Sequence, residues 1–157
     1  NDPEAVRKLG GIGIGEQIKL TLGGKESRLD HGPLDLKVKL LSRSSGHFEL
    51  ENKQSHLASL SGDFFEMGPC AVVQHDGVKI LLTTNKTAPF DLGQWRSQGI
   101  NPEELNVIVV KAAVAHRGAY DPIAARSFTV DTPGPCSSDL SRLPYRRVRR
   151  PIYPLDD

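Results

Sequence analysis

An Asp-Gly pair between two apolar runs constrains the fold of this chain more strongly than any other sequence feature. Asp76-Gly77 follows the run Cys70–Val73 and precedes the run Val78–Thr84. Asp-Gly supplies the two positive-φ residues that the tightest hairpin turns require, and β-branched residues pack well on a pleated sheet. The pattern therefore predicts an antiparallel hairpin over residues 70–84.

Alternation of apolar and polar residues marks a further strand at Leu34–Leu41. A period of two predicts a strand with one buried face and one wet face. The Ser-Ser-Gly turn that follows predicts a hairpin into a strand at His47–Leu50. Other apolar runs predict strands at Gln17–Leu22, Val107–Val110 and Ser127–Val130, and the β-branched run Val107–Val110 is expected to be buried.

Helices are expected to be few and short. Asp2 as the N-cap, followed by proline at the first helical position, predicts a helix over Pro3–Leu9. Two further helical segments are expected to begin at Asp91 and Asn101, whereas the polar stretch Glu51–Ser61 predicts a loop. Fifteen glycines and eleven prolines exclude a helical bundle.

Together these patterns predict an α+β fold, a mixed and mostly antiparallel β-sheet with a few short helices. The expected count is about seven or eight strands against three helices, and one parallel crossover between the Val78 and Val107 strands is permitted. At 157 residues the chain is expected to be a single domain, residues 1–157. Because it opens with Asn1 and not with Met, it is interpreted as a fragment of a longer protein.

Charge and hydropathy argue against two classes of partner. The net charge is +1 with neutral histidines, so no global field selects nucleic acid or an anionic membrane. No apolar run approaches the roughly 20 residues that span a bilayer, and the cytoplasm is the default location. The proline-rich tail carries four arginines, Arg146, Arg147, Arg149 and Arg150. Such a cluster could contact nucleic acid. We expect instead that these arginines hold the extended tail to the surface of its own fold.

The chain carries no complete catalytic or metal-binding pattern. Its five histidines are scattered singly, without the spacing of zinc sites, and no GxSxG nucleophile elbow is present. Glycines at residues 10–15 follow a helix and precede a strand, the reverse of a dinucleotide-binding loop. Cys70 is expected to be a buried, inert thiol, and the sequence leaves open whether it pairs with Cys136. No catalytic residue and no metal ligand is therefore predicted within this chain.

The most site-like stretch delivers Lys111, His116 and Arg117 directly after the Val107–Val110 run. These side chains could bind a carboxylate or phosphate, with arginine as a bidentate donor, lysine as a point charge and histidine as a donor or proton shuttle. The alternative is structural: Lys111 caps a strand end and Arg117 pairs with Asp121. Residue chemistry alone leaves both interpretations open.

The chain also resembles the C-terminal domain of the microcystinase C (MlrC) family along almost its whole length. Six motifs carry the resemblance, in order and at compatible spacing. They are LTLGGK at Leu20–Lys25, VKILLTT at Val78–Thr84, APFDLGQWRSQGINP at Ala88–Pro102, VIVVKAAVAHRGAYDPIA at Val107–Ala124, VDTPG at Val130–Gly134, and LPYRRVRRPIYPLD at Leu143–Asp156.

The resemblance implies a role that the residues alone do not. The family is regarded as zinc metallopeptidases (hydrolases), known first from microcystin degradation, whose larger N-terminal domain carries the zinc ligands. This chain would then be an accessory domain, inactive alone, that helps line the substrate cleft. Its partners would be the N-terminal catalytic domain and a peptide-like substrate, contacted by Lys111, His116 and Arg117.

One departure from the family pattern bears on the substrate. Many members have SSVHFRAAF after the lysine, whereas this chain has AAVAHRGAY, so Lys111 and Arg117 match directly and His116 is displaced. The change suggests a substrate different from microcystin. A non-enzymatic protein-interaction or ligand-binding module is the alternative function.

Overall fold

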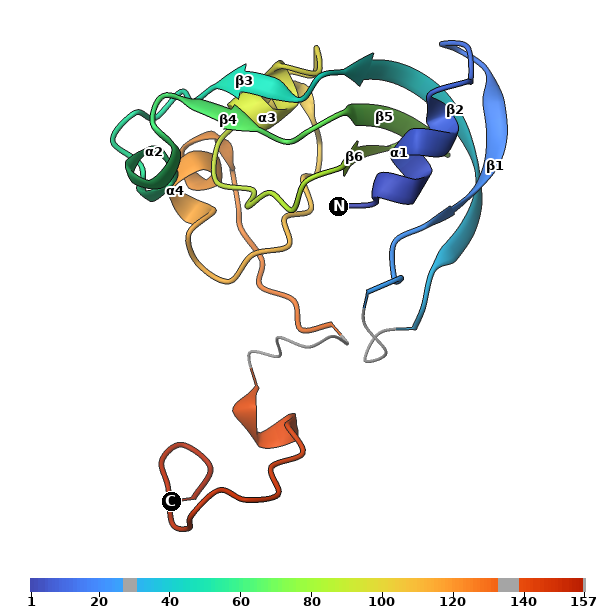
Figure 1. Cartoon of the computed structure of the whole chain (residues 1–157). Helices are drawn as coiled ribbons and strands as arrows, with labels where there is room; N and C mark the ends of the chain where they lie inside the picture. The colour runs from blue at the N-terminus through green and yellow to red at the C-terminus, as the bar shows by residue number, and fades with distance from the viewer. Residues whose placement is uncertain (27–30, 133–138, 157) are drawn as a thin grey trace.

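The first sheet of the molecule has four antiparallel strands in the order β1-β2-β5-β6 (Figure 1). The computed structural model describes residues 1–26, 31–132 and 139–156. The four strands are β1 (Gln17–Leu22), β2 (Leu34–Ser44), β5 (Cys70–His75) and β6 (Val78–Thr83). A separate two-stranded sheet joins β3 (His47–Glu49) to β4 (Phe64–Glu66). The predicted α+β class is confirmed; among the described residues there are six strands, and every pair is antiparallel.

The hairpin predicted from Asp76-Gly77 is confirmed. Both turn residues have positive φ, 43° at Asp76 and 85° at Gly77. Strands β5 and β6 then pair in register from His75↔Val78 to Cys70↔Thr83. The local turn chemistry therefore determines this part of the sheet.

The hairpin predicted between β2 and β3 is wrong. Strand β3 leaves the first sheet and pairs with β4, a partner supplied 15 or more residues further along the chain. Gly46 lies where the chain leaves the first sheet. Its φ is 77°, and a Cβ at this position would lie 1.9 Å from the Gly68 carbonyl oxygen. The Gly46 carbonyl accepts from the Met67 N–H at 2.9 Å, and this hydrogen bond joins the turn after β2 to the residue that follows β4.

The described residues also form four short α-helices: α1 (Pro3–Leu9), α2 (His56–Ser61), α3 (Gly93–Arg96) and α4 (Arg117–Tyr120). Three single-turn 3-10 helices cover Pro102–Glu104, Asp121–Ile123 and Leu140–Arg142. Helix α2 replaces the predicted loop, because the Ser55 side chain caps it at the Ala58 N–H and Leu57 packs in a core that the polar sequence does not reveal. No helix in these described ranges is long and apolar enough to cross a lipid bilayer.

Two hydrophobic clusters hold the body together. Helix α1 packs on the first sheet, where Leu9, Val38, Leu40 and Val73 are fully buried. The second cluster lies between the two sheets and α2; it contains Phe48, Leu50, Leu57, Ala58, Met67 and Cys70. Burial of such aliphatic side chains is worth roughly 1.5–3 kcal/mol each.

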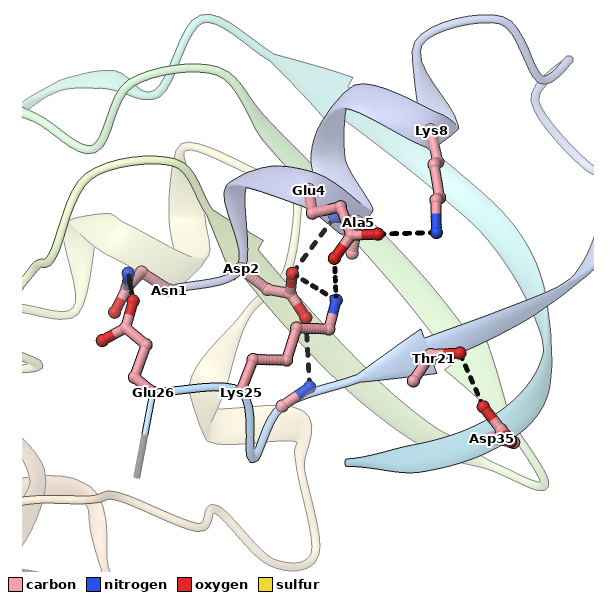
Figure 2. Close-up of polar contacts among 10 residues, drawn as sticks. Asn1, Asp2, Glu4, Ala5, Lys8, Thr21, Lys25, Glu26 and Asp35 are labelled. Carbon is pink, nitrogen blue, oxygen red and sulfur yellow. Dashed lines mark hydrogen bonds and ion pairs between the residues drawn. The ribbon is translucent and has the colours of Figure 1, made fainter. Parts of the chain in front are cut away.

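Asp2 fastens α1 to the turn that follows β1 (Figure 2). Its carboxylate is 4% exposed and accepts from the Ala5 N–H at 3.1 Å, the Gly23 N–H at 3.0 Å and Lys25 Nζ at 2.9 Å. Burial alone would raise the pKa of Asp2, but the hydrogen bonds and charge of Lys25 and the two backbone donors outweigh it and lower that pKa. The predicted N-cap is therefore also a tertiary contact.

The C-terminal third departs most from prediction. Neither Val107–Val110 nor Ser127–Val130 forms a strand, and the expectation that Val107–Val110 is buried is wrong: Val107 is 78% and Val109 86% exposed. Among the described residues no strand pairs with either segment, and Val107, Val109 and Val130 are exposed. The tail that follows residue 138 lies apart from both sheets in Figure 1; Arg150 pairs with Asp156 within the tail, and Arg142 pairs with Asp131 ahead of it. Cys136 and the end of the VDTPG motif lie outside the described residues.

Candidate functional site

A hollow of about 460 Å³ opens beside the predicted site residue Lys111. Two stretches far apart in sequence line it, residues 86–90 and residues 111–115. Each stretch contributes one lysine, Lys86 and Lys111, and both lysines are exposed. The rest of the lining is mostly alanine, proline, valine and phenylalanine, so the hollow combines an apolar floor with two positive charges.

The wall formed by residues 86–90 is firmly anchored. Gln94 Nε2 donates to the Ala88 carbonyl at 2.6 Å, and the Phe90 N–H donates to the same carbonyl at 3.0 Å. The Phe90 ring packs against the second hydrophobic cluster. Because these contacts act on main-chain atoms and a partly buried ring, the wall is held independently of the lysine beside it.

Helix α3 supplies that anchor and is itself fixed by a buried carboxylate. Asp91 is 1% exposed and accepts from the Gly93 N–H at 2.8 Å, the Glu51 N–H at 3.0 Å and the Asn52 N–H at 3.3 Å. Backbone donors satisfy the charge, as burial requires. The sequence predicts a helix that begins with Asp91 as its N-cap, whereas α3 begins at Gly93 with Leu92 as the N-cap. The bonds of Asp91 to the loop after β3 are long-range and carry no sequence signal.

The wall formed by residues 111–115 is held loosely. Its one backbone hydrogen bond within the described part of the chain runs from the Arg117 N–H to the Val114 carbonyl, at 3.0 Å. Lys111 has no hydrogen bond or ion pair among the described residues. The interpretation of Lys111 as a strand cap is wrong, because no strand precedes it.

His116 and Arg117 lie where α4 begins. Among the described residues, the buried Nδ1 of His116 has no hydrogen-bond partner. Arg117 is exposed, and within that same part of the chain it forms no ion pair with Asp121, whose carboxylate accepts instead from the Ser127 hydroxyl at 3.0 Å. Neither residue lines the hollow, so the structure brings Lys111 together with Lys86 rather than with its predicted companions.

Tyr120 attaches α4 to the body. It is 6% exposed, and its hydroxyl accepts from Trp95 Nε1 at 3.2 Å. Burial raises the pKa of Tyr120, so the hydroxyl stays neutral at physiological pH. The contact sets the position of His116, whose carbonyl accepts from the Ala119 and Tyr120 N–H groups.

The described residues do not fit a nucleophile or a metal centre. Burial raises the pKa of the Cys70 thiol to about 11, which keeps it protonated, and the thiol is 1% exposed. The described histidines, cysteine and carboxylates form no group of three or more that could hold a metal ion; His47, for example, meets Glu66 alone.

The fold and the hollow thus describe a domain with a closed core and an open, positively charged hollow, with one wall fixed and the other loosely held. The chain belongs to the family described as MlrC C-terminus, whose model matches residues 1–147. The family predicted from the sequence is confirmed.

A solved structure supports the same relationship. It is the crystal structure of a "Putative metallopeptidase" from Mesorhizobium sp. BNC1, 26% identical, with a TM-score of 0.80. The match covers 99% of this chain and 30% of that chain, so the present sequence spans less than a third of its relative. No curated protein matches the chain.

Proposed function

We propose that this chain is the accessory domain of an MlrC-like metallopeptidase, inactive alone, and that Lys111 binds a carboxylate of a peptide-like substrate. The observation that carries the proposal is the setting of Lys111. It is an exposed, charged side chain without a partner among the described residues, on the loosely held wall of a hollow whose opposite wall is fixed. A point charge over an apolar floor suits a substrate with one anionic group and an aliphatic chain.

His116 and Arg117 are proposed to act beside the hollow rather than within it. Arg117 is exposed and can reach a carboxylate bidentately, on the substrate or on a facing domain. The Nδ1 of His116 is buried and has no hydrogen-bond partner among the described residues, so it would take one hydrogen bond from a further group only after the start of α4 has moved. Lys86, which sequence reasoning missed, joins the proposed substrate contacts because it lines the same hollow.

The metal is proposed to be zinc held in another region of the parent protein. The donor set described above offers no site for it, whereas the metallopeptidase relative is more than three times as long as the aligned region. Elemental analysis tests this assignment: zinc is expected in the full-length protein and not in the 157-residue chain. Stoichiometric zinc on the chain alone would contradict it. A cytoplasmic location stays a prediction from the sequence.

The substrate role is tested by Lys111→Gln in the full-length protein. We expect KM for a peptide panel to rise, or kcat to fall, about tenfold, because one charge-assisted contact is lost. The matched control is Lys19→Gln, since Lys19 is exposed on the far strand β1. Equal kinetics for both variants, with folding intact, would reject the role of Lys111 and favour the non-enzymatic module.

A further inference from the structure

Residues 106–113 carry an apolar run without a partner. Val107 and Val109 are 78% and 86% exposed, whereas Ile108 and Val110 are half-buried. This alternation has the period of an extended chain that offers one bare face. Single exposed apolar residues are ordinary, but two β-branched side chains on one face of one segment form a surface.

The backbone of the same segment is also unpaired. Among the described residues, none of the backbone–backbone hydrogen bonds involves residues 106–113, and no strand lies against them. A β-branched segment with free N–H and C=O groups is a template for pairing with another strand. The segment therefore has the composition of a strand, but within the described part of the chain it makes no backbone hydrogen bonds to another strand.

A second bare segment follows α4. Phe128 and Val130 are 77% and 74% exposed, and they are two residues apart, as neighbours on one face of an extended chain are. The Arg126 guanidinium lies 5.7 Å from the centre of the Phe128 ring and leaves most of that ring open. The two bare segments thus flank the same short helix in the sequence.

We propose that residues 106–110 add a β-strand to the edge of a sheet in the remaining region of the longer protein, with Val107 and Val109 buried on that sheet and Phe128 and Val130 contributing to the same interface. Recognition by strand addition uses main-chain hydrogen bonds for affinity and alternate side chains for specificity. The inference rests on the proposed function only in taking this chain as part of a longer protein.

The length of the relative identifies the occupant. About 70% of the related chain lies outside the aligned region, enough for a complete domain with its own sheet. The run carries no charge between Asn106 and Lys111, so as an added strand it would extend the apolar face of a sheet within the same protein. Pairing would also fix residues 111–115, which follow directly, and would turn the loosely held wall of the hollow into a rigid one.

Amide hydrogen exchange on the full-length protein tests the proposal. We expect the amides of residues 107–110 to exchange at least about tenfold more slowly in the full-length protein than in the 157-residue chain. The β5 amides are the internal control, since they are paired on both sides and should be protected in both samples. If the shorter chain proves unfolded by that control, the rates in the full-length protein decide alone, and unprotected amides there overturn the proposal.

Variants of the full-length protein separate strand pairing from simple apolar cover. Val109→Asp should abolish the protection, whereas Val78→Asp, on a valine that is 60% exposed on β6, should leave it within twofold. Proline removes one backbone donor, and alternate donors of a strand point to opposite edges. One of Ile108→Pro and Val109→Pro should therefore abolish the protection more completely than the other; equal loss would overturn strand addition.

Two further outcomes are informative. Protection that rises with concentration in the 157-residue chain, with a dimer in sedimentation, would assign the surface to a second copy and overturn the chosen occupant. Lost protection in Val109→Asp together with a normal response to Lys111→Gln would separate this interface from the substrate role. Unchanged Lys111→Gln kinetics with protected amides would reject the proposed function and leave the interface standing.

Discussion

The body of the molecule and the segment 105–132 use the same residue types with opposite results. In β5, Ala71, Val72 and Val73 are 0–1% exposed: β2 and β6 pair with the strand on both sides, and Ala71 and Val73 lie in the core cluster that includes residues of α1. In Val107–Val110 a similar run leaves Val107 and Val109 exposed and Ile108 and Val110 only half-buried. Apart from Pro102 and Tyr120, the buried apolar residues of the described chain lie at or before Ile100. The comparison shows that a strand-like composition is not enough to form a strand: the segment also needs a neighbouring strand with which to pair.

The largest expected effect concerns Gly46, at the connection between the two sheets. Gly46→Ala should destabilise the chain by about 3 kcal/mol or more, because φ is 77° and the new Cβ would lie 1.9 Å from the Gly68 carbonyl oxygen. Gly62→Ala is the control, with φ of 73° and open space around it. It should cost about 1–3 kcal/mol, because its φ of 73° and ψ of −154° lie in a region almost confined to glycine. Urea unfolding of both variants measures the contrast; equal costs would show that the joint between the two sheets tolerates movement.

The same substitution in the two regions tests the comparison directly. Val73→Ala should lower the free energy of unfolding by about 2–3 kcal/mol, since two buried methyl groups are lost and a cavity remains. Val109→Ala in the same chain should change it by less than about 0.5 kcal/mol, because the side chain is 86% exposed. A large cost at Val109 would mean that the segment packs within this chain, and the contrast would fail.

Acid should loosen the body through Asp2. Its pKa is lowered by folding, so its contribution is complete above the ordinary carboxyl pKa of about 3.9 and is lost as the pH falls through the lower folded value. Asp2→Asn should cost about 2 kcal/mol at pH 7 and progressively less below pH 4. Asp35→Asn is the control, because within the described ranges the Asp35 carboxylate accepts from the Thr21 hydroxyl alone, at an exposed position (Figure 2). Thermal unfolding across pH measures both, and a pH-independent Asp2→Asn cost would refute the assignment.

The smallest expected effect concerns the Trp95–Tyr120 hydrogen bond, which connects α4 to the rest of the molecule. Tyr120→Phe removes the acceptor of the Trp95 indole N–H and should cost about 1 kcal/mol. The loss should be local, with faster exchange of the Ala119 and Tyr120 amides and unchanged β5 amides. Tyr145→Phe, in the exposed tail, should have no effect on either. Global destabilisation by Tyr120→Phe would show that α4 belongs to the cooperative body.

The sequence predicts the parts of this fold that depend on neighbours in the chain. The Asp2 cap, the β1 and β5 strands and the Asp76-Gly77 turn are local, and all are confirmed. The choice of β4 as the partner of β3 is tertiary and leaves no local mark. Helix α2 was missed because two buried apolar residues, Leu57 and Ala58, outweigh a polar composition.

The candidate site likewise contains one lysine that the sequence predicts and one that only the folded structure reveals. Lys111 stands out in the sequence because a charge directly follows an apolar run. Lys86 cannot be recognised, since only the folded chain brings residues 86–90 beside residues 111–115. The Trp95–Tyr120 contact joins residues 25 apart and equally lacks a pattern.

The anchoring of the hollow by main-chain atoms bears on how this family can diversify. The wall at residues 86–90 is positioned through the Ala88 carbonyl, the partly buried Phe90 ring and the Thr87 hydroxyl, which donates to the Asn85 carbonyl at 3.0 Å. The exposed side chain of Lys86 makes no such contact among the described residues, so position 86 can exchange side chains without moving the wall. Natural drift or directed selection at residue 86 has a route to new ligand preferences that leaves the architecture intact.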